Sequence, residues 1–207
     1  MAVERLTRER RRELTRSTLV AAAAQVFAAR GFHGASLDEI AETAGFTRGA
    51  IYKNFANKEE LFFAVCDNDF DLTLQSFSQK LEHDGGPLDV AGLAQLWREA
   101  VGSDTDKVAL SMEFRLYAMR NADVAARFAE HQRETRRALA QFMVDEAERA
   151  GLRVTIPAVT LAGLLDAASW GFLESACIEP RDTGLLESFL ELILATACSA
   201  DTCTDDA

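Results

Sequence analysis

Nearly every stretch of this chain between its glycines and prolines has the periodicity of an amphipathic helix, and this feature limits the fold more than any other. Near the N-terminus, Leu19, Ala23, Val26 and Phe27 recur at three- and four-residue steps, which places them on one helical face. Alternating β-branched runs are few, and no Asn-Gly or Asp-Gly hairpin turn joins such runs. The sequence therefore predicts an all-α protein.

Glycines and prolines also mark where the helices are expected to end. Gly31 and Gly45 follow the first two apolar segments, and Gly85, Gly86 and Pro87 interrupt a later one. We predict a small N-terminal domain at residues 1–56, a larger domain at 57–200 and a disordered acidic tail at 201–207. About nine helices are expected, near residues 8–29, 36–44, 47–55, 58–83, 88–102, 105–121, 123–150, 157–177 and 182–199.

Polar residues at the starts of the short helices match known capping patterns. Ser36 with Glu39 three residues later forms a predicted capping box. Thr47 is the expected cap of the third helix, and Asn57 with Glu60 forms another box-like start for the fourth. These signals fix the beginnings of three helices within about 25 residues.

Charge is distributed unevenly along the 207 residues. The chain has a formal net charge of -11, yet residues 1–60 carry a net charge of +2 and the remainder -13. An acidic body repels nucleic acid and anionic membranes, so any DNA contact should be confined to the first quarter. A mild charge gradient alone has little meaning, because solvated faces produce one as well.

Cysteine usage and the lack of an obvious export or membrane segment favour the cytoplasm. The four cysteines form no close C-x-x-C pair and no cluster with histidine, so we expect reduced thiols. No run reaches the roughly 18 apolar residues that a membrane-crossing helix requires. We therefore expect a cytoplasmic protein without a membrane partner.

The second and third predicted helices, separated by Gly45-Phe46, form a helix-turn-helix within a three-helix head. The second helix of such a unit inserts its N-terminal end into the major groove. Gly49 and Ala50 would permit close approach there, and Arg48 can pair with a guanine edge or a phosphate. An ordinary helical hairpin with a solvated basic face is the alternative interpretation.

The stretch SLDEIAETAGFTRGAIYKNFANKEELF resembles the DNA-binding signature of the TetR/AcrR-type family of transcriptional regulators. Beyond residue 62 the similarity is only generic. The resemblance implies a homodimer that binds a palindromic double-stranded DNA operator, usually as a repressor, although the sequence is equally compatible with an activator. The matching positions are Gly31-Phe32, Ile40-Ala41, Ala44-Gly45, Tyr52, Phe55, Lys58-Glu59 and Leu61.

The resemblance also implies a set of DNA-contacting positions. Ser36 matches a position that often touches phosphate, although helix capping alone would explain it. A basic arm formed by Arg8, Arg10, Arg11, Arg12 and Arg16 could add phosphate contacts or could equally be a solvated face. Together with the small residue Ala50, the expected DNA-binding set is Ser36, Thr47, Arg48, Gly49, Ala50, Tyr52, Lys53 and Lys58.

The last two long helices are the candidates for dimerisation. Segments 159–178 and 185–198 are apolar around most of their circumference, so each must be buried on several sides. Pairing with the same helices of a second copy would achieve this burial, and packing within one monomer is the alternative.

A site for a small lipophilic effector is expected within the larger domain, lined by aromatic residues and by acids among apolar neighbours. Each aromatic residue could instead belong to the plain core, and each acid could pair with a structural arginine. In the resembling family an effector shifts the fourth helix and changes the separation of the two heads. The candidate effector-site residues are Trp97, Glu113, Phe114, Tyr117, Phe142, Asp166 and Trp170.

The motifs of several enzyme classes are missing from the sequence. No Glu-x-x-His pair, G-x-S-x-G, P-loop or dinucleotide fingerprint occurs, and the three histidines are isolated from one another. We therefore expect no catalytic residues, no metal and no cofactor. The competing functional class is a helical ligand- or partner-binding protein that does not bind an operator.

Overall fold

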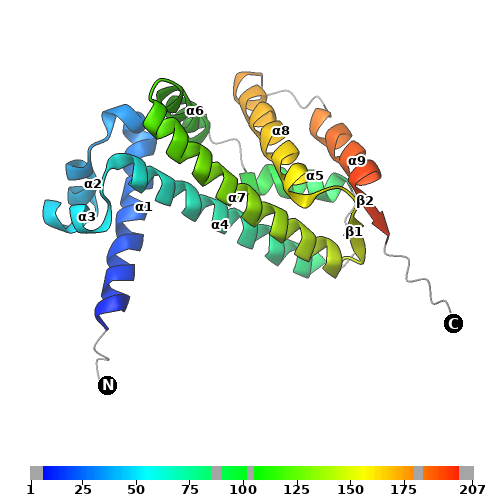
Figure 1. The fold of residues 1–207 in the computed structure, drawn as a ribbon, viewed down its shortest axis with the longest axis horizontal. Helices are drawn as coiled ribbons and strands as arrows, with labels where there is room; N and C mark the ends of the chain where they lie inside the picture. The colour runs from blue at the N-terminus through cyan, green and yellow to red at the C-terminus, as the bar shows by residue number, and fades with distance from the viewer. Residues whose placement is uncertain (1–6, 85–89, 102–104, 180–183, 201–207) are drawn as a thin grey trace. The chain divides into compact units, whose positions relative to one another are not determined.

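A computed structural model describes residues 7–84, 90–101, 105–179 and 184–200 of the chain (Figure 1). The tail expected at 201–207 lies outside the described residues. Within them the protein is all-α, as predicted, and the first four helices begin within one residue of their predicted starts. The helices are α1 (Arg8–Gly34), α2 (Leu37–Thr43), α3 (Arg48–Asn54), α4 (Lys58–Asp84), α5 (Val90–Val101), α6 (Thr105–Met119), α7 (Ala122–Arg149), α8 (Ala158–Ile178) and α9 (Leu185–Ala197).

Two short strands depart from the helical prediction. β1 (Leu152–Val154) pairs antiparallel with β2 (Cys198–Ala200), and Arg153 lies opposite Ser199. Each strand has only three residues, which is too short to produce a readable alternation of apolar and polar side chains. Gly151, with φ 67°, turns the chain directly after α7 and allows β1 to begin.

α1 does not stop at Gly31 as predicted. Its helical path is interrupted there, because Gly31 has φ 69° and ψ 174°, and one further turn continues to Gly34. The left-handed φ explains why the helical path is interrupted at the residue where the sequence predicts its end.

By packing, the described chain divides into two compact units, and the first contains α1, α2 and α3. It comprises the described residues up to Phe70 together with Ala109–Ala125. Its centre is aromatic: the rings of Phe62 and Phe114 stack at 4.1 Å, and Phe32 meets Phe114 edge-on at 4.8 Å. Phe27 is also fully buried against Phe32 and Phe62. The first unit therefore takes part of its core from α6, beyond the domain limit predicted at residue 56.

The second unit comprises the described residues of Asp71–Val108 and those from Ala126 on. Ala94 of α5 packs with Leu186 and Leu190 of α9, and Trp97 and Phe172 lie against this cluster. The indole Nε1 of Trp97 donates a hydrogen bond to Ser169 Oγ at 3.1 Å, which joins α5 to α8. Burial of these faces stabilises the unit in proportion to the apolar area removed from water.

α8 corrects the expectation that no segment is apolar enough to cross a membrane. By length and composition alone, Ala158–Ile178 meets that criterion, although little of it is buried within one chain. It does so because Asp166 and Glu174 are the only charged residues between its ends. A helix at a protein–protein interface meets the same criterion.

Candidate nucleic-acid interface

The turn between α2 and α3 is fixed by backbone hydrogen bonds. Gly45 has φ 71°, and its N–H donates to Glu42 O at 3.0 Å, while Phe46 N–H donates to Ala41 O at 2.8 Å. Ile40 and Ile51 are fully buried and fasten the inner faces of the two helices to the head. The outer face of α3 is consequently held at a defined position and left open to solvent.

Arg48, Tyr52 and Lys53 are exposed on that outer face. Arg48 Nε lies 3.1 Å from Asp38 Oδ1 of α2, and its guanidinium carbon lies 5.6 Å from the centre of the Tyr52 ring. The arginine side chain nonetheless remains 73% exposed. Since the ion pair engages Nε, the terminal nitrogens remain able to donate to a base edge or a phosphate.

Nothing in the surrounding structure requires a glycine at position 49. Its φ is not in the left-handed region, and a Cβ added there would meet only Thr47 Oγ1, at 3.9 Å. Glycine in the first turn of a helix costs about 1 kcal/mol relative to alanine. The fold itself therefore does not require a glycine at this position.

Thr47 and Ser36 differ in how they begin their helices. Ser36 Oγ accepts a hydrogen bond from Glu39 N at 3.2 Å, which confirms the predicted cap, although Glu39 turns its carboxylate to Arg30 instead of completing the box. Thr47 occupies the N-cap position of α3 but makes no side-chain capping hydrogen bond, contrary to expectation. The Thr47 hydroxyl therefore does not cap α3.

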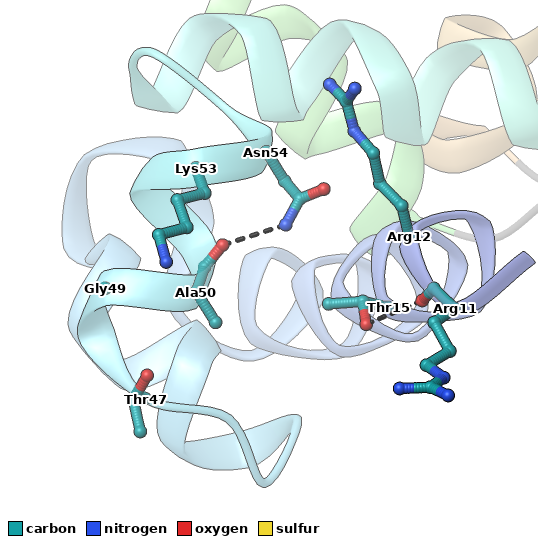
Figure 2. A pocket seen from close by; sticks show the side chains of 8 residues that line it. All are labelled: Arg11, Arg12, Thr15, Thr47, Gly49, Ala50, Lys53 and Asn54. Atoms are coloured by element: carbon teal, nitrogen blue, oxygen red, sulfur yellow. Dashed lines mark hydrogen bonds between the residues drawn. The ribbon is translucent and has the colours of Figure 1, made fainter. Parts of the chain in front are cut away.

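A basic groove lies beside the start of α3 (Figure 2). It has a volume of about 390 Å³ and lies between the first turns of α1 and one face of α3. Three of its lining residues are cationic and none is acidic, so the groove favours an anion. The residues are Arg11, Arg12 and Thr15 from α1, and Thr47, Gly49, Ala50, Lys53 and Asn54 from the α3 region.

Lys58, predicted to contact DNA, is bound within the head. Its Nζ donates to Ala35 O at 2.9 Å and to His33 O at 3.3 Å, and it lies 4.7 Å from the centre of the Phe32 ring. Burial lowers the pKa of this amine, while the neighbouring Glu59 and Glu113 carboxylates oppose that shift. The lysine joins the start of α4 to the α1–α2 connection, so an external anion is not needed to explain a lysine at this helix start.

Three of the predicted effector-site residues, Glu113, Phe114 and Tyr117, belong to the core of the first unit. Glu113 accepts backbone hydrogen bonds from Phe32 at 2.9 Å and from His33 at 2.8 Å. Phe114 is fully buried, and Tyr117 donates to Glu59 Oε1 at 2.8 Å. Glu113 therefore serves as a structural cap, a role that the sequence could not reveal because its partners lie about 80 residues away.

The other four predicted effector-site residues lie in the second unit, so the structure does not bring all seven together in one unit. Trp97, Phe142, Asp166 and Trp170 are all half-buried. Asp166 Oδ2 lies 3.8 Å from Arg136 Nη2, so this acid pairs with an arginine, although not with Arg115 or Arg120, the two that the sequence suggested as examples. No group of three potential metal ligands occurs among the residues that the structure describes.

Sequence reasoning missed Asp38, Thr15 and Asn54 at this interface. Asp38 has the position of an acid in the first turn of α2, where interaction with the helix dipole is a sufficient explanation. Thr15 reaches the groove only because α1 passes beside α3, and Asn54 only because α3 ends there. No local sequence signal reports such packing of two helices.

The family model described as "Bacterial regulatory proteins, tetR family" matches residues 19–65, which cover most of α1 and all of α2 and α3. The chain is 29% identical over 179 residues to the HTH-type transcriptional regulator UidR of Escherichia coli K12, covering 86% of this chain and 88% of UidR. It is 26% identical over 182 residues to the HTH-type transcriptional repressor AcnR of Corynebacterium diphtheriae, covering 87% and 90%.

Solved structures with the same fold include GusR of Salmonella enterica. GusR superimposes with a TM-score of 0.62 at 24% identity, over 93% of this chain and 98% of GusR. At this level of identity the likeness concerns the fold alone. It extends over both compact units, whereas the family model covers only the N-terminal elements.

Proposed function

Because the chain is a TetR-family transcriptional regulator, and is not an enzyme, we propose that it binds a palindromic operator as a homodimer and acts as a repressor in the cytoplasm. The observation that carries this proposal is the outer face of α3, where Arg48, Tyr52 and Lys53 are exposed beside a glycine that the fold does not require. An α-helix of this kind fits the major groove by its N-terminal end.

The DNA contacts that we propose for the individual residues follow from side-chain chemistry. Arg48 reads a base edge, because its terminal nitrogens can donate two parallel hydrogen bonds to guanine O6 and N7. Ser36, Thr47, Tyr52 and Lys53 contact phosphates and fix the register. Gly49 and Ala50 allow the helix to approach closely. Lys58 contributes positive charge near the wall of the DNA major groove, while its hydrogen bonds hold the head together.

The homodimer is proposed to form through α8 and α9. Each helix buries one side within its own unit, at Leu161 and Leu173 of α8 and at Leu186 and Leu190 of α9. Each also exposes a second apolar side. On α8 this side carries Leu164, 50% exposed, and Ile178, 77% exposed. The exposed Gly171 lies between them, seven residues from each. On α9 this side carries Leu185, 59% exposed, and Leu192, 62% exposed, which are also seven residues apart.

Residues repeated at seven-residue steps form the seam of a helix pair, and small residues within it allow close contact. A second copy of the same faces would remove these side chains from water. Sedimentation of the wild type should show a dimer, and Leu164→Glu with Leu192→Glu should shift it towards a monomer that retains helical circular dichroism. A wild type that sediments as a monomer at micromolar concentration would contradict this arrangement.

We propose that a small lipophilic effector binds the second unit, near Trp97 and Trp170, and reduces affinity for the operator. These are the only two tryptophans in the chain, so intrinsic fluorescence reports on both candidates directly. Trp97→Phe and Trp170→Phe variants would assign any quenching to one of them. Phe142 and Asp166 of the same unit remain candidates, and wild-type affinity in each single-tryptophan variant, measured by quenching of the remaining tryptophan, would exclude Trp97 and Trp170 as contacts of the effector.

Selection of duplexes from a genomic fragment library is the experiment that tests operator binding. The wild type should enrich a palindrome whose half-sites lie about one helical turn apart, roughly 34–36 Å. Arg48→Ala should weaken binding by about 1–3 kcal/mol and relax the preference at one position in each half-site. Arg149→Ala, an exposed ion-paired arginine of the second unit, is the matched control. No enriched sequence for the wild type would favour a helical ligand- or partner-binding protein without operator binding.

A further inference from the structure

We propose that the first turns of α1 form, with α3, a preformed groove that binds a phosphodiester of the duplex beside the bases read by Arg48. This inference rests on the proposed function and extends the interface to residues of α1 that helix-turn-helix geometry alone does not require. Arg11, Arg12 and Thr15 form one wall, and Thr47, Gly49 and Lys53 lie on the other (Figure 2).

The electrostatics of the groove support an anionic occupant. Arg11, Arg12 and Lys53 contribute three positive charges and no acid lines the groove, although the whole chain has a net charge of -11. Thr47 adds a hydroxyl that makes no capping hydrogen bond to α3. Cationic and hydroxyl donors on two elements that line one groove are of the kind that holds phosphate oxygens in protein–DNA complexes.

The two walls of the groove are held at a fixed spacing by Arg16. Its Nη1 donates to the backbone oxygen of Asn54 at 3.1 Å, and its guanidinium carbon lies 4.3 Å from the centre of the Phe55 ring. The Asn54 side chain in turn donates to Ala50 O at 2.8 Å. Arg16 is therefore a positioning residue that joins α1 to the end of α3, and it differs in role from Arg11 and Arg12.

A phosphodiester of duplex DNA fits this groove because of where the groove lies. Thr47 and Gly49, at the start of α3, belong both to the groove and to the expected base-reading end of the helix. A helix that enters the DNA major groove lies beside the phosphate backbone of one DNA strand. The wall of the protein groove that α1 forms would then lie against that backbone. Such contacts strengthen binding without reading the sequence.

The test is fluorescence anisotropy of labelled duplex, titrated with the full-length protein at several salt concentrations. Arg11→Ala and Arg12→Ala should each lower affinity on the order of tenfold, and by the same factor for operator and unrelated duplexes. Each lost phosphate contact should reduce the slope of log K against log salt by about 0.9 per protomer, or about 1.8 for a dimer.

Arg10→Ala is the matched control, because Arg10 lies on the same helical turn, is exposed and pairs with Glu13 at 3.2 Å, and does not line the groove. It should change the slope much less. Arg16→Ala should weaken binding and Arg16→Lys should restore it only in part, because lysine lacks the planar fork that stacks on Phe55.

The outcomes separate this proposal from the one on which it depends. If Arg11→Ala and Arg12→Ala keep the wild-type slope on every duplex, the phosphate groove is refuted even though operator binding stands. If the wild type shows no sequence preference but the two variants still lose salt dependence on unrelated duplex, operator recognition fails and the groove is supported. Circular dichroism of each variant shows that the fold is retained.

Discussion

Replacing Gly31 by alanine should destabilise the protein through two separable effects. The residue has φ 69° and ψ 174°, a conformation that L-residues rarely adopt, which costs about 1–3 kcal/mol. The added Cβ would also lie 2.5 Å from Glu113 Oε2, well inside contact distance. Glu113 must then withdraw from at least one of its two backbone donors, and a hydrogen bond to a charged group contributes about 1.5–3 kcal/mol.

The total expected loss for Gly31→Ala is therefore about 2.5–6 kcal/mol. In a Glu113→Ala background the steric conflict is absent, so the same change should cost only the backbone strain of about 1–3 kcal/mol. The difference, about 1.5–3 kcal/mol, is the coupling energy of the two positions in a double-mutant cycle. Urea unfolding monitored by circular dichroism, at one protein concentration for all variants, measures each corner of the cycle.

Gly45 provides the matched control within the same unit. It has φ 71°, but a Cβ added there would meet nothing within 4 Å. Gly45→Ala should therefore cost only backbone strain, and it should cost the same with and without Glu113. Equal losses for Gly31→Ala in the two backgrounds would refute the argument that Glu113 and Gly31 require one another.

Three further changes are informative. Gly49→Ala should raise helix stability by up to about 1 kcal/mol yet weaken DNA binding, and anisotropy that shows unchanged affinity would remove close approach as the reason for this glycine. Asp38→Asn should leave affinity for unrelated duplex within about threefold but lower the operator preference, because Arg48 loses the ion pair that orients it; an unchanged ratio would contradict this. Burial of the thiol raises the pKa of Cys66 from 9.0 to about 12, so the folded state retains a proton that the unfolded chain releases. Urea unfolding should then show the wild type losing stability relative to Cys66→Ala as the pH rises from about 9 towards 12, by at most about 1.4 kcal/mol per pH unit, and parallel curves would contradict it.

Local signals in the sequence were sufficient for the elements of the head. Asn57 Oδ1 accepts from Glu60 N at 2.8 Å, as the box-like pattern predicts, whereas Glu60 Oε2 accepts from Ala56 N at 2.8 Å, one residue before the donor that a capping box uses. Ile51 and Phe55 lie four residues apart, where helical periodicity places them on one face, and they are 0% and 1% exposed. These predictions succeed because capping and helical periodicity depend on neighbours within four residues.

Contacts between distant parts of the chain could not be read from the sequence. Glu113 and Tyr117 looked like residues of an effector site because an acid and an aromatic stand on one apolar helical face, yet their partners are Phe32, His33 and Glu59. The sequence likewise did not predict the ion pair between Asp38 and Arg48, because the presence of each residue is sufficiently explained within its own helix. Pairing between separate helices depends on how they pack, which periodicity does not encode.

The first compact unit is assembled from two separate parts of the chain, and this has a consequence for modularity. Phe114 and Glu113 come from a segment that follows the described residues up to Phe70 by about 40 positions. A fragment that ends after α3, or even at Phe70, would lack the ring that stacks on Phe62 and the carboxylate that caps Phe32 and His33. Transferring the helix-turn-helix to another protein would therefore require that Ala109–Ala125 be transferred with it, and chimeras that exchange only the N-terminal quarter should expose an unfilled aromatic core.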